Sequence, residues 1–165
     1  MSLERLWAGW RSSYVSAPTT GTDDDGCVLC RLAAADDDRA ALVLERTERT
    51  ITVMNLYPYG SGHLMAAPLR HVAGLDELDD DDALALTQAQ VRAIRAIRAA
   101  YAPDGINLGA NLGRAAGAGV PGHLHVHVLP RWAGDTNFMT SVAETRVLPE
   151  TLHEGYAKLV EVWPR

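Results

Sequence analysis

Three histidines at alternating positions, His123, His125 and His127, have the residue type and spacing that most directly suggest chemistry in this chain. In an extended strand, side chains two positions apart point to the same face. The three imidazoles would then share one surface, while the apolar residues between them pack on the other. Histidine is not an especially good strand former, so the repetition favours a function over packing. In such a row, one histidine can have a structural role, one can be a nucleophile and one can be an acid or a donor to phosphate.

A shared metal ion is the other chemistry that clustered histidines suggest. At about 3.3 Å per residue, the first and third histidines lie roughly 13 Å apart along a strand. Zinc holds each nitrogen ligand at about 2 Å, so one ion cannot bind all three. A pair such as His123 and His125 could share an ion with a third ligand. A hydrolytic metal site therefore stays open as an alternative.

Cys27-Val28-Leu29-Cys30 is a second possible site, with three open interpretations: a redox dithiol, a disulfide or half of a zinc site. An Asp-Gly loop precedes the pair where a thioredoxin-like site would have a strand. A disulfide is disfavoured in a cytosolic chain. Zinc would need two further ligands, which the remaining histidines can supply.

Hydrophobic periodicity and turn signals indicate the elements that position these residues. Runs of apolar and β-branched residues predict five strands, over 41–46, 50–54, 63–68, 105–111 and 123–129. Pro130-Arg131-Trp132 is expected to leave the last strand in a loop. His63, taken alone, is typical of an ordinary surface histidine.

One long helix is predicted over 79–101, because its first turn is acidic and arginines follow toward its end. Its apolar side chains fall on roughly one face, which we expect to pack across a sheet. These residues are Leu84, Val91, Ile94, Ile97 and Tyr101. A second amphipathic helix is predicted over 150–162, with His153 uninvolved in any site.

Composition limits the class of protein. The chain has 165 residues, a hydrophobic content of 47% and a net charge of −6, which suit one domain with a real core. No run approaches a membrane span and the first residues lack a signal-peptide pattern, so we expect a cytoplasmic protein without a membrane partner. The negative charge disfavours nucleic-acid binding but not small phosphate esters. Residues 1–26, which carry two tryptophans, are expected to be a docking segment and loop, and 27–165 a single domain.

The motif His-Leu-His-Val-His-Val-Leu at 123–129, preceded by Asn111-Leu112-Gly113 and a glycine-rich run at 116–120, resembles the signature of the histidine triad (HIT) family of nucleotide hydrolases and transferases. The segment 55–65, Asn-Leu-Tyr-Pro-Tyr-Gly-Ser-Gly-His-Leu-Met, resembles the family's other conserved block. The resemblance is closest to the branch of small actinobacterial-type diadenosine tetraphosphate phosphorylases, and it covers about residues 27 to 140.

This resemblance implies an α+β fold, in which one long helix crosses a five-stranded antiparallel sheet and a C-terminal helix follows, and it implies a homodimer. It also implies an enzyme that transfers a nucleotidyl group from the α-phosphate of a diadenosine polyphosphate. His125 would be the nucleophile, and His127 would donate to phosphoryl oxygens or the leaving group. Inorganic phosphate or water would release the nucleotidyl-histidine. No organic cofactor is expected.

Further site residues follow from the same resemblance. Zinc-containing members imply a structural zinc, held by Cys27, Cys30, His71 and His123 in a closed site. The substrate-binding residues would be Asn55, at the ribose, with His63, Asn111, Gly119, His127 and Trp132. Many members have glutamine where this chain has Gly119, so contacts there must come from the backbone, and the glycines of 113–122 would let amides approach phosphates.

Two other functions remain open. One is an adenosine phosphoramidate hydrolase of the same family, recognisable by cleavage of a phosphoramidate. The other is a non-catalytic zinc-binding or nucleotide-binding module, in which His125→Ala would leave turnover unchanged.

Overall fold

The structure is a computed structural model that describes residues 26–136 and 148–164. The expected docking segment 1–26 lies, apart from Gly26, outside the described residues. The division of the chain at residue 27 therefore stays a prediction.

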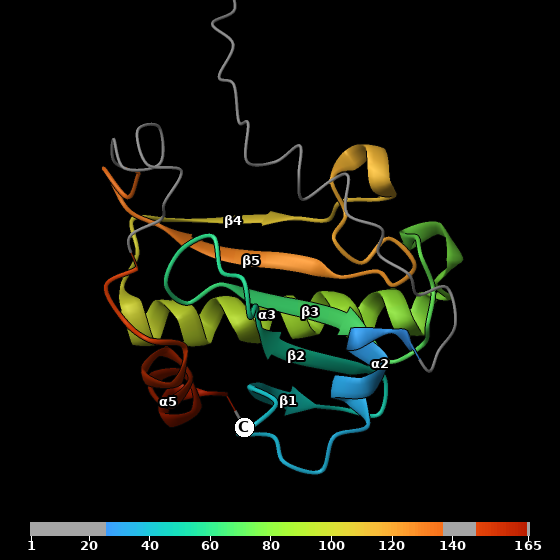
Figure 1. Cartoon of the computed structure of the whole chain (residues 1–165), viewed down its shortest axis with the longest axis horizontal. Helices are drawn as coiled ribbons and strands as arrows, with labels where there is room; N and C mark the ends of the chain where they lie inside the picture. The colour runs from blue at the N-terminus through green and yellow to red at the C-terminus, as the bar shows by residue number, and fades with distance from the viewer. Residues whose placement is uncertain (1–25, 137–147, 165) are drawn as a thin grey trace, which may run out of the picture.

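A five-stranded antiparallel sheet forms the centre of the fold, which confirms the predicted architecture (Figure 1). Its order is β1-β2-β3-β5-β4, so β5, which carries His127, lies between β3 and β4. The strands are β1 Val43–Arg46, β2 Thr50–Met54, β3 Leu64–Pro68, β4 Gly105–Gly109 and β5 Val126–Arg131.

Helices lie on both faces of the sheet (Figure 1). They are α2 Val28–Ala33, α3 Asp80–Tyr101 and α5 Leu152–Val162, with short 3-10 turns η2 Leu75–Glu77 and η3 Arg114–Ala116. The long α3 crosses one face and packs on Leu64 and Val128. On the other face, α2 packs through Leu29 against Ile51 and Val53. All five residues of β2 are buried because both layers cover it.

The long helix begins and ends close to its predicted limits. The side chain of Asp79 caps it by accepting a hydrogen bond from the backbone N–H of Asp82 at 2.8 Å. Ala102 then adopts a left-handed conformation with φ of 43°, and Pro103 follows it, so the helix cannot continue.

The packing face predicted for this helix is wrong in part. Leu84 is 57% exposed and Val91 39% exposed. The buried face consists of Leu86, Ala89, Ala93, Ala96 and Ile97. Alanine lets the helix axis approach the sheet closely, so small residues occupy the seam and the larger side chains at Leu84 and Val91 remain outside.

The last strand starts and ends later than predicted. Val126 is its first residue, so His123 and His125 precede it and the three histidines are not a row on one strand. Pro130 and Arg131 belong to the strand, although a loop was expected there. Pro130 is tolerated because β3 pairs with β5 only between Val126 and Val128, so the proline needs no N–H on that side.

The fold leaves β4 largely uncovered, since four of its five positions are exposed. It also ends at Gly109, two residues before its predicted end. Among the described residues, no helix combines the length and apolar content that a membrane crossing needs.

Candidate functional site

Three histidines meet at the start of β5, and one of them comes from another strand. The rings of His125 and His127 lie edge to face with centroids 5.0 Å apart. His63, which directly precedes β3, places its Nε2 3.0 Å from the Nδ1 of His127. His63 is fully buried, so its interpretation as a surface histidine is wrong.

The hydrogen bonds of these rings determine which nitrogen carries the proton. The Nδ1–H of His125 donates to the backbone carbonyl oxygen of His123 at 2.8 Å, which leaves the Nε2 of His125 with a lone pair. The backbone N–H of Tyr59 donates to the Nδ1 of His63 at 3.0 Å. The proton of His63 is therefore on Nε2 and is donated to the Nδ1 of His127, so neutral His127 carries its proton on Nε2.

Both histidines near the start of β5 are held neutral. Burial lowers the pKa of His125, although the hydrogen bond to the His123 carbonyl opposes that shift. Burial, and after it the neighbouring charge on His125, lowers the pKa of His127 to about 4. At neutral pH the pair consists of one imidazole that offers a lone pair and one that offers an N–H.

A tight turn between β2 and β3 supports His63. Asn55 is buried, and its side-chain oxygen accepts from the backbone N–H of Tyr57 at 3.0 Å. Its amide nitrogen lies 3.4 Å from the Nδ1 of His63. Gly62 has a φ of +68°, and a Cβ there would lie 2.7 Å from a ring carbon of Tyr101. Glycine is required at that position, because any side chain would push the turn away from α3.

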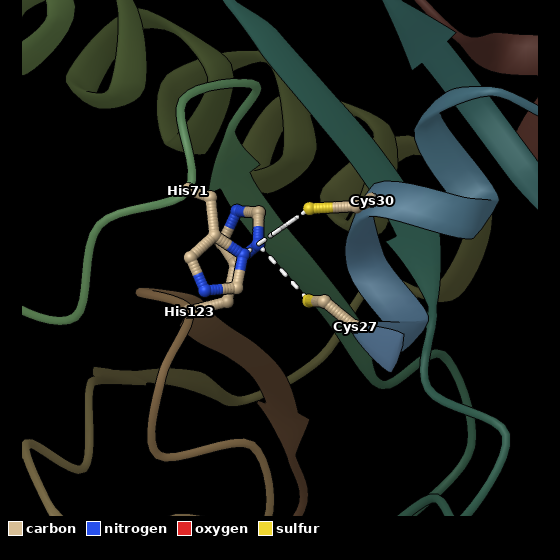
Figure 2. A group of neighbouring side chains, drawn as sticks. All are labelled: Cys27, Cys30, His71 and His123. Atoms are coloured by element: carbon tan, nitrogen blue, oxygen red, sulfur yellow. Dashed lines mark hydrogen bonds between the residues drawn. The ribbon is translucent and has the colours of Figure 1, made fainter. Parts of the chain in front are cut away.

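Two cysteines and two histidines form a second cluster next to the first (Figure 2). The four ligand atoms of Cys27, Cys30, His71 and His123 all lie within 4.8 Å of one another. The Nδ1 of His123 lies 3.2 Å from the Sγ of Cys27, and the Nδ1 of His71 lies 3.3 Å from the Sγ of Cys30. No disulfide joins the cysteines. The structure thus brings together all four ligands that the resemblance implied.

The surroundings of His123 suit a metal ligand. Its Nε2–H donates to the carbonyl oxygen of Pro68 at 2.9 Å, so the lone pair on Nδ1 faces the sulfurs. Ligand bonds of about 2.0–2.3 Å in a tetrahedron would separate nitrogen from sulfur by roughly 3.5 Å, which matches the distances above. Two cysteine thiolates and two neutral imidazoles are a donor set that zinc accepts, so the residues fit a metal ion.

The remaining predicted substrate residues contact other parts of the chain. The side-chain N–H of Asn111 donates to the carbonyl oxygen of Gly117 at 3.4 Å, across the glycine-rich loop. Gly119 is half-buried in the same loop. The ring of Trp132 lies edge-on to Tyr101 with centroids 6.2 Å apart. The guanidinium of Arg131 is paired with Asp135, so its charge is already matched.

A comparison with protein families gives one match, the HIT domain, over residues 37–134. The match covers more than half of the chain and includes both histidine clusters except for the cysteines. The chain belongs to the HIT domain family.

Two relatives of this HIT-domain chain carry named activities. It is 36% identical over 167 residues to the AP-4-A phosphorylase of Mycobacterium tuberculosis, covering 99% of this chain and 86% of the relative. It is 28% identical over 108 residues to the adenosine 5'-monophosphoramidase hnt1 of Schizosaccharomyces pombe, covering 64% of this chain and 74% of that protein.

A solved structure is also similar to it. This is a zinc-bound histidine triad family protein from Mycobacterium smegmatis, with a TM-score of 0.68 and 25% identity. The similarity covers 85% of this chain and 94% of that chain.

Two residues of this HIT-domain chain orient site histidines without having been predicted to do so from the sequence. Tyr59 was part of the recognised motif, but its ring packs 4.5 Å from His63 and 5.5 Å from His127, and its N–H orients His63. The Pro68 carbonyl, which orients His123, has no sequence signal because any residue offers a carbonyl there. For Tyr59, the sequence offers one signal, which is an aromatic residue in the turn before Gly62-His63.

Proposed function

We propose that this protein is a nucleotidyl transferase that cleaves diadenosine polyphosphates at an α-phosphate, with a covalent nucleotidyl-histidine as intermediate. The proposal depends on one observation. The hydrogen bond from His125 to the His123 carbonyl leaves a lone pair on His125 Nε2, beside an imidazole that presents an N–H. The similarity to the AP-4-A phosphorylase over nearly the whole chain supports diadenosine tetraphosphate as the substrate.

In the first step, His125 Nε2 attacks the α-phosphorus and forms a P–N bond. The bond from that phosphorus to the bridging oxygen breaks, and ATP leaves when the substrate is diadenosine tetraphosphate. The N–H of His127 stabilises charge on the phosphoryl oxygens or the leaving oxygen. In the second step an acceptor attacks the same phosphorus and the P–N bond breaks, which restores neutral His125.

The acceptor determines the reaction class, and products identify it. Inorganic phosphate gives ADP plus ATP, which is phosphorolysis. Water gives AMP plus ATP, which is hydrolysis. We expect ADP when diadenosine tetraphosphate is incubated with the protein in phosphate buffer, with AMP as the minor product. AMP alone at saturating phosphate would assign the protein to the hydrolases.

The covalent step is tested by trapping. Substrate labelled at the α-phosphate should leave an acid-labile label on a peptide that contains His125. His125→Ala should lose both the label and at least about 10⁴-fold in turnover, as removal of a nucleophile does elsewhere. His153→Ala is the matched control, because His153 is exposed on α5. Full turnover in His125→Ala would exclude His125 as the nucleophile, whereas binding without turnover in the wild-type protein would leave a non-catalytic binding module as the better description.

Adenosine phosphoramidate hydrolysis is the second candidate, supported by similarity to hnt1. The same attack by His125 would release an amine. An amine is a more basic leaving group than ATP, so it must be protonated as it leaves. Relative kcat/KM values for the phosphoramidate and for diadenosine tetraphosphate separate the two candidates.

For the metal we propose zinc in a structural role, held by Cys27, Cys30, His71 and His123. Bound there, zinc would cross-link three segments of the chain and leave no open coordination position for chemistry. The donor set and the zinc-bound relative support this assignment. The alternative of a hydrolytic ion shared by His123 and His125 is disfavoured, since the ligand atom of His123 lies with those of Cys27, Cys30 and His71, a cluster that does not include His125.

For substrate binding we propose Asn55, His63, Asn111, Gly119 and Trp132 in addition to His127. Asn55 and His63 are supported by their contact with each other beside His127. Gly119 would contribute only its backbone. Trp132 has the least support, because its ring contact is with Tyr101.

We also propose a homodimer and a cytoplasmic location. The exposed strand β4 at the edge of the sheet supports the dimer, since unpaired edge strands invite pairing with another chain.

A further inference from the structure

A buried carboxylate at the start of α3 joins two arginines from distant parts of the chain. The side chain of Asp82 is 4% exposed, and it accepts from Arg49 Nη1 and from Arg70 Nη1, each at 2.8 Å. A buried charge needs such partners, because loss of either would leave it poorly compensated. Both arginines are themselves about half exposed.

The two arginines differ in what they tether. Arg49 immediately precedes β2, whereas Arg70 immediately precedes the metal-site residue His71. Arg70 makes further contacts at the start of α3, to Asp79 at 3.2 Å and to the carbonyl oxygen of Glu77 at 3.0 Å. The planar guanidinium of Arg70 thus connects the His71 segment to Asp82 of α3, to the N-cap residue Asp79 and to Glu77 in the turn before the helix.

The residue after His71 is anchored as well. Val72 packs with Leu86 of α3 and with Leu124. Its carbonyl oxygen accepts from the backbone N–H of Leu124 at 2.6 Å. His71 therefore stands between two fixed neighbours, and its Nδ1 faces the Sγ of Cys30. A ligand that is already positioned loses less conformational entropy when an ion binds.

We propose that Arg70 is a positioning residue for the metal centre: its ion pair with Asp82 holds His71 where the ligand must be and slows loss of the metal. This inference rests on the zinc assignment proposed above. Arg49 shares the same carboxylate but reaches it from β2, so it stabilises the fold without holding His71. The pair therefore offers a matched comparison within one ion-pair network.

The test compares Arg70→Met with Arg49→Met in the intact chain. Each protein is loaded with zinc, and release is followed with a chromophoric chelator. We expect Arg70→Met to release zinc about tenfold faster or more, the size of effect that outer-shell partners have elsewhere. Arg49→Met should release it near the wild-type rate. Arg70→Lys keeps the charge but cannot reach all three acceptors. Its rate of zinc release should therefore lie between the rates of Arg70→Met and Arg49→Met.

A second pair covers the case in which Arg70→Met does not fold. Asp82→Asn should also speed zinc release, whereas Asp81→Asn should not, because Asp81 is 76% exposed and its ion pair in the described part of the chain is with Arg49 and not with Arg70. Unfolding midpoints of the metal-free proteins measure general destabilisation separately. Equal acceleration within both pairs would overturn the inference and leave the zinc assignment intact. A wild-type protein that retains no zinc would overturn the zinc assignment and this inference with it.

Discussion

Each histidine of the triad has a role that its partner determines. His123 turns its Nδ1 to two sulfurs, His125 donates its Nδ1–H to a carbonyl, and His127 accepts at Nδ1 from His63. Three side chains of one type thus present a ring nitrogen to the two sulfurs, a lone pair on Nε2 and an N–H. The chemistry depends on these tautomers more than on the spacing in the motif.

The depressed pKa of His127 predicts a pH dependence of stability. The folded protein resists protonation down to about pH 4, whereas the unfolded chain takes up that proton near pH 6.5. Between these values the unfolded state binds more protons, so stability rises with pH. The contribution of His127 is complete above pH 6.5 and is lost as pH falls toward 4. We expect His127→Gln to reduce the difference in urea midpoint between pH 7 and pH 5.

His153→Gln controls for that experiment, because His153 is exposed and should leave the difference unchanged. An unchanged difference in His127→Gln would mean that His127 titrates alike in both states.

At the scale of elements, α3 packs through alanine. Ala89, Ala93 and Ala96 are fully buried against the sheet, and Leu84 faces outward. Periodicity of large apolar residues pointed to Leu84 and Val91 because it weighs side-chain size and ignores how closely two elements approach.

This arrangement predicts a large loss of stability for one substitution on the helix and almost none for another. Ala93→Leu inserts a large side chain where the helix meets the sheet, and overpacking of this kind costs about 1–3 kcal/mol. Leu84→Ala removes exposed surface and should change stability by no more than about 0.5 kcal/mol. Urea unfolding of both variants measures the free energies. If Leu84→Ala lost more free energy of unfolding than Ala93→Leu, the packing face predicted from the sequence would be the correct one.

At the scale of the whole molecule, the candidate metal site brings together residues that are far apart in the sequence. Cys27 and His123 are 96 positions apart, and Cys30 and His71 are 41 apart. An ion that closes such long loops limits the freedom of the unfolded chain.

Removal of the metal should therefore destabilise the whole domain. We expect a strong chelator to lower the free energy of unfolding by about 3 kcal/mol or more, the stabilisation that a ligand gives when it is well above its Kd. Added zinc should restore it. Cys30→Ala should start from the lower stability and not respond to the chelator. A wild-type protein whose unfolding curve ignores the chelator would exclude a structural metal.

The uncovered edge of the sheet makes a prediction about assembly. Leu108 is 48% exposed on β4, and a charge on an edge strand blocks pairing with another chain. We expect Leu108→Lys to convert a dimer into a folded monomer in sedimentation velocity at micromolar concentration. Val160→Lys on α5 is equally exposed and should stay dimeric. A wild-type protein that sediments as a monomer would contradict the proposed dimer.

The sequence by itself determined the local structure and the list of site residues. Runs of apolar and β-branched residues located β2 and β3, and an acidic first turn with arginines toward the end located α3 within one residue. The resemblance to the family supplied the four candidate metal-site residues and the histidine pair. These features depend on neighbours along the chain, or on a pattern shared with relatives, so they can be recognised before folding is considered.

Only the tertiary structure decided how those residues are oriented. The proton on His127 is directed by His63, which is 64 positions away, and His71 is held by an arginine that pairs with the start of α3. The alanine face of α3 and the late start of β5 likewise depend on what packs opposite. Tautomers, ion pairs and helix faces follow from distances between segments, and local periodicity carries no information about those distances.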